Sequence, residues 1–296
     1  MNKTTIVTIL LITLSFSKDL IADCVKGDCL DGYGEIQYET LVYSGLFLKG
    51  KYSGLGKLTY KNGIIIEGNF ENDAQVGEVT VKLDNSLTIS AVYDGTKYIK
   101  CGELIEKDRE PIKLKLKNGS CFGKNILLTP GSILIGSLSN FNLDGIGALY
   151  ILSYEPGLIK EEGFWVKNSL TKGKVIFSNN SQYEGNLVKR MPNGFGTMTY
   201  PDGSIYSGNW LKGQKDGFGK FFKSTEKRKE ESETYNSALS QEGEILKYIG
   251  YWKNGIPHGK ALEYFQNNIM TESCYDFGKK VLQSKLCDSQ TIDRNN

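Results

Sequence analysis

One pattern of tyrosine, glycine and tryptophan recurs along the chain, and it constrains the fold more than any other feature of the sequence. In the copy that begins at Tyr206, glycine follows at 208, tryptophan at 210, and two further glycines at 217 and 219. A copy that begins 23 residues earlier, at Tyr183, fills nearly every slot in the same way. Further copies begin at Tyr43 and Tyr248. Four copies in one chain predict a protein built from stacked repeats.

The repeat framework is the set of positions that these four copies share: Tyr43, Gly45, Phe47, Gly54, Gly56, Tyr183, Gly185, Gly194, Gly196, Tyr206, Gly208, Trp210, Gly217, Gly219, Tyr248, Gly250, Trp252 and Gly259. Weaker copies begin near residues 66, 134 and 161, and residues 84–133 depart most from the pattern. The pattern resembles the membrane occupation and recognition nexus (MORN) repeat, and the resemblance covers most of residues 27–278. It implies an elongated antiparallel ribbon with a groove along one side.

Strand geometry gives a physical reading of the same residues. Alternate residues of a strand share a face, so Tyr206, Gly208 and Trp210 should point one way and Asn209 the other. Rings can then lie flat over the bare backbone of glycine. The dipeptides Asn62-Gly63, Asn118-Gly119 and Asp202-Gly203 favour type I′ turns.

Each period is therefore read as one hairpin. Because hairpins of this size are marginal alone, neighbours must stack to bury their aromatic face. The expected fold is all-β, an elongated twisted antiparallel sheet of stacked hairpins in an open array.

The chain is expected to begin with a signal peptide at residues 1–17. An apolar run at residues 4–14 follows Lys3, and small residues flank Phe16, so the mature chain should begin at Lys18. This predicts export to the periplasm, the envelope or the exterior. Residues 21–24 offer an alternative, a lipoprotein anchored at Cys24, although Asp23 stands where a small neutral residue is expected.

The rest of the chain divides by its pattern. The repeat array is expected over residues 18–223, degenerate at 84–133, with C-terminal repeats over 248–278 and a tail over 279–296. Residues 224–247 interrupt it, and their charged core lacks apolar periodicity, which predicts a solvated loop. A binding or cleavage segment is the alternative.

An even number of cysteines permits disulfides in an exported protein. The candidates are Cys24, Cys29, Cys101, Cys121, Cys274 and Cys287. Local pairing of Cys24 with Cys29 and of Cys274 with Cys287 would pin the two ends of the array, where no neighbouring repeat protects the edge. Free buried thiols are the alternative.

Composition argues against several classes of function. Lys and Arg number 36 against 34 for Asp and Glu, so the net charge of +2 provides no field for capturing nucleic acid. His258 is the only histidine, and the resemblance places it at a repeat position that often carries one. No catalytic constellation, metal site or cofactor motif is recognised. We therefore expect a non-enzymatic scaffold or protein-interaction module.

Two alternatives stay open for the function. The first is an accessory domain that works with an enzyme on another chain, and the second is association with a membrane or its lipids. A protein partner is expected in the main reading, and exposed ribbon ends make self-association plausible. The framework aromatics serve every copy whatever it binds, so the better ligand candidates are aromatics outside the framework: Phe195, Phe218, Phe221, Phe222 and Tyr251.

Overall fold

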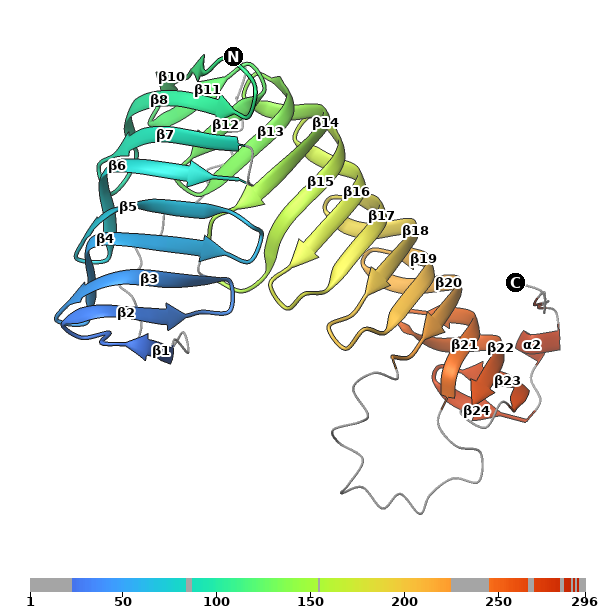
Figure 1. The fold of residues 1–296 in the computed structure, drawn as a ribbon. Helices are drawn as coiled ribbons and strands as arrows, with labels where there is room; N and C mark the ends of the chain where they lie inside the picture. Colours follow the sequence, from blue (N-terminus) through green and yellow to red (C-terminus); the bar gives the residue numbers. More distant parts are fainter. Residues whose placement is uncertain are drawn as a thin grey trace, which may run out of the picture.

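A computed structural model describes residues 23–83, 87–153, 155–224, 245–265, 269–282, 285–288, 290 and 292. Within these ranges the chain forms two antiparallel sheets in which strands pair in sequence order (Figure 1). The predicted signal peptide and most of the predicted inserted loop lie outside the described residues. The expected all-β array of hairpins, open rather than closed into a barrel, is confirmed.

The first sheet contains β1 (Asp23–Gly27), β2 (Gly32–Gln37), β3 (Leu41–Leu48), β4 (Lys51–Tyr60), β5 (Ile65–Glu71), β6 (Ala74–Lys82), β7 (Leu87–Tyr93), β8 (Tyr98–Glu106) and β9 (Ile112–Lys113). The second sheet begins with β10 (Lys115–Lys117), β11 (Ser120–Gly123), β12 (Ile126–Thr129), β13 (Ser132–Ser139), β14 (Asn142–Ile151), β15 (Leu158–Val166), β16 (Ser169–Phe177) and β17 (Gln182–Val188). It continues through β18 (Met191–Thr199), β19 (Ile205–Leu211), β20 (Gln214–Phe222), β21 (Ile245–Lys253), β22 (Ile256–Phe265), β23 (Met270–Asp276) and β24 (Lys279–Val281). A single helical turn, α2 (Lys285–Asp288), follows the last strand.

Strand β19 shows how the repeat specifies a face. Tyr206 and Trp210 are buried and Asn209 between them is exposed, as strand alternation predicts. Gly208 pairs with Gly219 of β20, so two bare backbones lie side by side beneath the tyrosine ring. We call the side that carries the framework rings the aromatic face and the other side the opposite face.

The turns alternate between two kinds, and this corrects the prediction of type I′ turns at Asn62-Gly63 and Asp202-Gly203. At both sites the closing pair encloses three residues, with Tyr60 N bonded to Ile64 O and Tyr200 N to Ser204 O. Only the glycine has a positive φ, as in a type I turn followed by a bulge. Two-residue loops with positive φ at both positions occur at Asn118-Gly119, as predicted, and inside the repeats, for example at Lys212-Gly213.

The hydrogen-bonded ladder breaks between β9 and β10, which the expectation of one continuous array did not include. Leu114 lies at the break, and its N–H donates to Gly102 O of β8, which extends the β8–β9 register by one residue before the chain leaves the first sheet. A disulfide between Cys101 of β8 and Cys121 of β11 joins the two sheets beside this point. The chain therefore turns back on itself, and the first sheet packs its aromatic face against β12 and β13 (Figure 1).

Turns of the first sheet hold the two sheets together by hydrogen bonds to the second sheet. Thr40 Oγ1 donates to Ser153 O at 2.8 Å, and Ser178 Oγ donates to Glu39 Oε1 at 2.7 Å. Asn62 Nδ2 donates to the carbonyls of Ile151 and Ile159 at 3.0 and 3.1 Å. Beyond β16 the second sheet extends away from the first as an arm (Figure 1). The core of the second sheet begins at Leu127 of β12 and continues along this arm.

Candidate interaction surface

The framework tyrosines make the same contacts in all four repeats. Each hydroxyl donates to the backbone carbonyl three residues ahead, as in Tyr206 OH to Asn209 O at 3.0 Å and Tyr183 OH to Asn186 O at 2.8 Å. Tyr43 and Tyr248 repeat this bond at 3.0 Å each. Burial of these rings raises the pKa of their hydroxyls, to about 12 for Tyr43 and Tyr183. The tyrosine hydroxyls are therefore used in hydrogen bonds to the backbone of their own repeat.

Trp210 of the framework and Trp165 of a weaker copy each join one repeat to the previous one. Trp210 Nε1 donates to Gly196 O at 3.0 Å, and Trp165 Nε1 donates to Gly147 O at 2.9 Å. The ring of Trp210 also meets Tyr183 and Tyr206 edge-on, with centroids 5.6 and 5.0 Å apart. The framework rings on the aromatic face of the arm therefore largely cover one another.

One repeat carries a carboxylate in the tyrosine slot. Glu161 stands two residues before Gly163, where the other repeats have tyrosine, and it is buried. Among the described residues its one partner of opposite charge is Arg190, whose Nη2 lies 3.1 Å from Oε2. Burial raises the pKa of Glu161, and the charge of Arg190 opposes that effect.

The structure brings four of the five predicted ligand candidates onto one face. Phe218 and Tyr251 pair across β20 and β21 with ring centroids 5.4 Å apart, and Phe195 lies on the same face of β18 with 60% of its surface exposed. Phe222 is farther along that face of β20, where Lys247 lies over its ring. Phe221 points the other way and packs against the core of the arm, so it does not join the other four.

Sequence reasoning missed two members of this set. Ile146 of β14 and Phe164 of β15 pair directly on the same face, with 76% and 52% of their surfaces exposed. The missed signal is positional: a residue between two framework glycines, or between a glycine and the framework tryptophan, must point away from the aromatic face. We call the aligned set the outer row: Ile146, Phe164, Phe195, Phe218 and Tyr251.

The row is broken by polar side chains at intervening strands. Lys172, Asn186 and Asn209 hold the equivalent positions of β16, β17 and β19. The surface is therefore a broken apolar stripe on a glycine-rich backbone, well suited to contact with another macromolecule.

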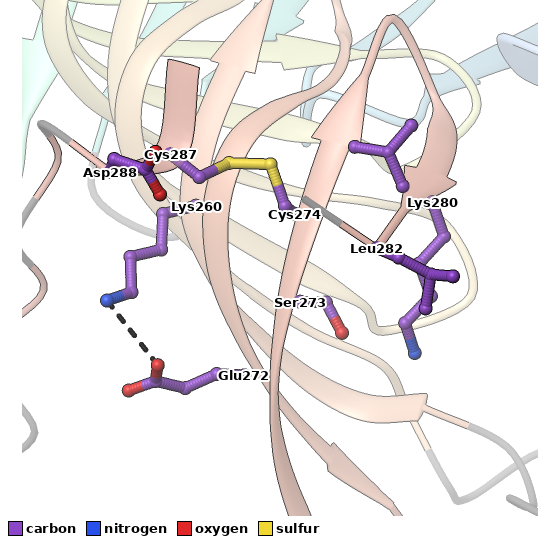
Figure 2. Close-up of a pocket in the computed structure, with 9 residues that line it drawn as sticks. Lys260, Glu272, Ser273, Cys274, Lys280, Leu282, Cys287 and Asp288 are labelled. Carbon is purple, nitrogen blue, oxygen red and sulfur yellow. Dashed lines mark ion pairs between the residues drawn. A yellow bond between two sulfur atoms is a disulfide. The ribbon is translucent and has the colours of Figure 1, made fainter. Parts of the chain in front are cut away.

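The first sheet carries exposed apolar residues at equivalent positions, where Tyr33 pairs directly with Leu46. The C-terminal end of the array holds a cavity of about 740 Å³, which lies beside the Cys274–Cys287 disulfide. Lys260 and Glu272 line it and form an ion pair, with 3.4 Å between Nζ and Oε2 (Figure 2). Beneath it, buried Glu263 accepts hydrogen bonds from Ser273 and Tyr275 and pairs with Lys280 at 3.2 Å. These bonds hold the last strands together.

His258 and the cysteines have structural contacts in the ranges described. His258 Nδ1 accepts a hydrogen bond from the Phe277 N–H at 3.2 Å, and its ring lies against Phe277. Among the described residues no three His, Cys, Asp or Glu side chains gather as metal ligands. The helical turn that the structure describes is far too short to cross a bilayer. Cys24 is bonded to Cys29 and Cys274 to Cys287, in addition to the Cys101–Cys121 bond.

Fold and framework together define a protein built from stacked β-hairpin repeats. The profile of the MORN repeat matches residues 43–65, 183–205, 206–225 and 248–270, and the chain carries MORN repeats at these four segments. No curated protein matches the chain. MORN repeats generally take part in protein or membrane interactions.

Proposed function

We propose that this chain is an exported, non-enzymatic module that holds a protein partner against the outer row. The observation that carries the proposal is the exposure of Ile146, Phe164 and Phe195 in register on one face. Large apolar side chains that cluster in solvent mark interaction surfaces, and aromatic anchors contribute most of the binding energy at such surfaces.

Charge favours a protein partner over an anionic membrane. The lysines that share this face alternate with acidic residues, as where Lys174 pairs in register with Glu162 and Glu184. Membrane recognition by anionic lipid requires a cluster of basic residues without such compensation. A mixed surface instead suits the polar rim of a protein interface.

A photo-crosslinking experiment tests the surface. A benzophenone side chain placed at Phe195 should form an adduct with the partner in the native host, and mass spectrometry would identify it. The same group at Ile105, an exposed apolar residue of β8 in the first sheet, serves as the control. Adducts that form equally at both positions would remove the outer row from the proposal.

Binding to the identified partner then gives a quantitative test. Replacing Phe164 and Phe195 together by serine should weaken binding by at least about tenfold, because truncation of an anchor costs about 2 kcal/mol or more. Ile105→Ser should bind as the unmodified chain does. Equal affinities for the double variant and the unmodified chain would contradict the proposal.

Export is the second part of the proposal, and the disulfides support it. Three disulfides are typical of an oxidising compartment outside the cytoplasm. The bond between Cys24 and Cys29 also occupies the sulfur that a lipid anchor would need, which favours cleavage by an ordinary signal peptidase. Mass spectrometry of envelope and secreted fractions should find a chain that starts near Lys18. An intact Met1 on cytoplasmic material would contradict export.

A further inference from the structure

Lys215 of β20 places its ammonium group among aromatic rings on the aromatic face of the arm. The distance from Nζ to the ring centroid is 4.5 Å for Trp252, 4.9 Å for Phe221, 5.0 Å for Tyr206 and 5.2 Å for Tyr200. Within the described ranges, no carboxylate forms an ion pair with this ammonium. We call these rings and Lys215 the caged lysine.

The repeat does not require a cation at this position. Lys215 pairs across the hairpin with the framework residue Trp210. In the other hairpins the residue opposite the framework aromatic or leucine is uncharged: Tyr52, Gln75, Leu143, Leu170, Pro192 and Pro257. A neutral side chain therefore satisfies the packing, and the lysine adds a cost that packing does not explain.

That cost is the partial removal of the ammonium from water. Burial lowers the pKa of Lys215 to about 8. The ring faces attract a cation, but they offer its three N–H groups no strong acceptor. An anion beside Nζ would supply both the missing acceptor and a compensating charge.

We propose that the caged lysine is a binding site for a carboxylate joined to an apolar or aromatic body. The carboxylate accepts charge-assisted hydrogen bonds from Lys215 Nζ, and the body packs against Tyr200 and Phe221, the two rings that are only half-buried. The site goes beyond the proposed function, because it lies on the other face of the sheet from the outer row. A free carboxylic acid and an acidic side chain of a peptide would present the same chemistry.

The pH dependence of binding follows from the protonation of Lys215. A carboxylate binds the ammonium form, so affinity should fall as pH rises through about 8. Tyr200 and Tyr206 face the same ammonium, but burial raises the pKa of both hydroxyls and they stay neutral in this range. Asp216, the next residue in the chain, is paired with Lys253 at 3.1 Å.

Nuclear magnetic resonance on the mature chain with ¹³C at lysine ε-carbons tests the site. Sodium benzoate should shift the Lys215 signal in a saturable way, while the neutral benzamide should not. Lys215→Met should weaken benzoate binding by about tenfold or more, since hydrogen bonds to a charged group contribute about that much. Lys220→Met is the matched control, because Lys220 lies on the opposite face of the same strand.

A second variant separates loss of binding from loss of folding. Lys215→Arg should keep benzoate binding but remove its decline between pH 7 and pH 9.5, because the guanidinium does not titrate there. Blocked peptides containing Glu-Phe or Gln-Phe identify the source: tighter binding of the Glu-Phe peptide than of benzoate indicates an acidic segment, and the reverse indicates a small acid. Benzoate binding that survives in Lys215→Met, or a preference for benzylamine over benzoate, would overturn the proposal.

Discussion

At the scale of single residues, the pairing of Gly208 with Gly219 shows how little space the repeat leaves. A Cβ added at Gly208 would lie 2.7 Å from the Tyr206 hydroxyl and 2.8 Å from Phe218 O. Gly208→Val should therefore destabilise the protein by about 1 to 3 kcal/mol through overpacking. Asn209→Val, on the exposed face, should cost much less, because a β-branched residue suits a strand. Urea denaturation of the two variants measures the difference.

Hydrogen exchange on the same variants adds a spatial test. Because stacked repeats contact mainly their neighbours, the damage at Gly208 should reach the hairpins of Tyr183 and Tyr248 and fade toward Tyr43. Equal destabilisation by both substitutions would contradict the assignment of faces, and uniform loss of protection along the chain would contradict the open array.

The carboxylate in the tyrosine slot gives a prediction about pH. Burial raises the pKa of Glu161 in the folded state, so the folded protein favours the protonated form. The free energy of unfolding should therefore fall as pH rises from about 4.5, the ordinary value, through the raised pKa. Glu161→Gln should remove that part of the pH dependence, measured by thermal unfolding between pH 4 and pH 7.

Glu162→Gln provides the matched control for this experiment. Glu162 lies on the opposite face of the same strand and pairs with Lys160 at 2.6 Å. An identical pH profile for Glu161→Gln and the unmodified chain would show that the buried carboxylate does not control this dependence. At this scale, strand alternation predicted which residues face the core. It could not predict that Arg190, a turn residue, reaches Glu161, because that contact crosses two strands.

At the scale of elements, the turns of the first sheet do more than reverse the chain. Asn62 shapes its own turn by accepting a bond from Ile64 N and also donates two bonds to the second sheet. Asp202 performs the same local role on the extended arm by accepting bonds from Ser204 N at 2.9 Å and from Ser204 Oγ at 3.0 Å. Asn62→Ala removes three hydrogen bonds and Asp202→Ala two local ones, so Asn62→Ala should cost about 1 kcal/mol more, at about 1 kcal/mol per lost bond. Chemical denaturation of both variants checks this difference, and equal costs would mean that the bonds between sheets contribute nothing.

The hairpins could be predicted from sequence because every repeat carries its own glycines and aromatics. The kind of turn was harder, because Asn-Gly and Asp-Gly occur both in two-residue loops and in three-residue loops with a bulge. Ladder register decides between them, and register depends on pairs such as Tyr60 with Ile64 that no dipeptide specifies. Of the five predicted ligand candidates, Phe195, Phe218, Phe222 and Tyr251 lie on one face. Phe221 lies on the other face, because it alternates with Phe222 along β20.

At the scale of the whole molecule, the fold depends on where the ladder breaks. Residues 84–133 carry almost no motif, so the sequence pattern gave no direction for the array there. The fold back at Leu114 arises from contacts between distant strands, such as the packing of the first sheet on β12 and β13. The repeat motif predicts how adjacent hairpins stack. It does not predict the bend, because the residues that form the bend lie outside the motif.

The Cys101–Cys121 disulfide should stabilise this bend. It closes a loop of 20 residues, for which removal of the cross-link costs about 3 kcal/mol. Replacing both cysteines by alanine should lower hydrogen-exchange protection in β8 and β11 to β13, and leave β17 to β20 unchanged because repeats couple mainly to neighbours. Loss of protection that is as large in β19 as in β8 would show that the two sheets unfold as one unit.

The three disulfides share a place in the fold: one ties the first strand, one spans the break between the sheets, and one ties the last strands to α2. An unpaired strand edge is where fraying, proteolysis and pairing with foreign strands begin. In a reducing compartment these three sites would lose their covalent links while the repeats between them kept their packing. Reduction of these bonds should therefore expose the two ends and the bend of the array to proteolysis before the repeats between them.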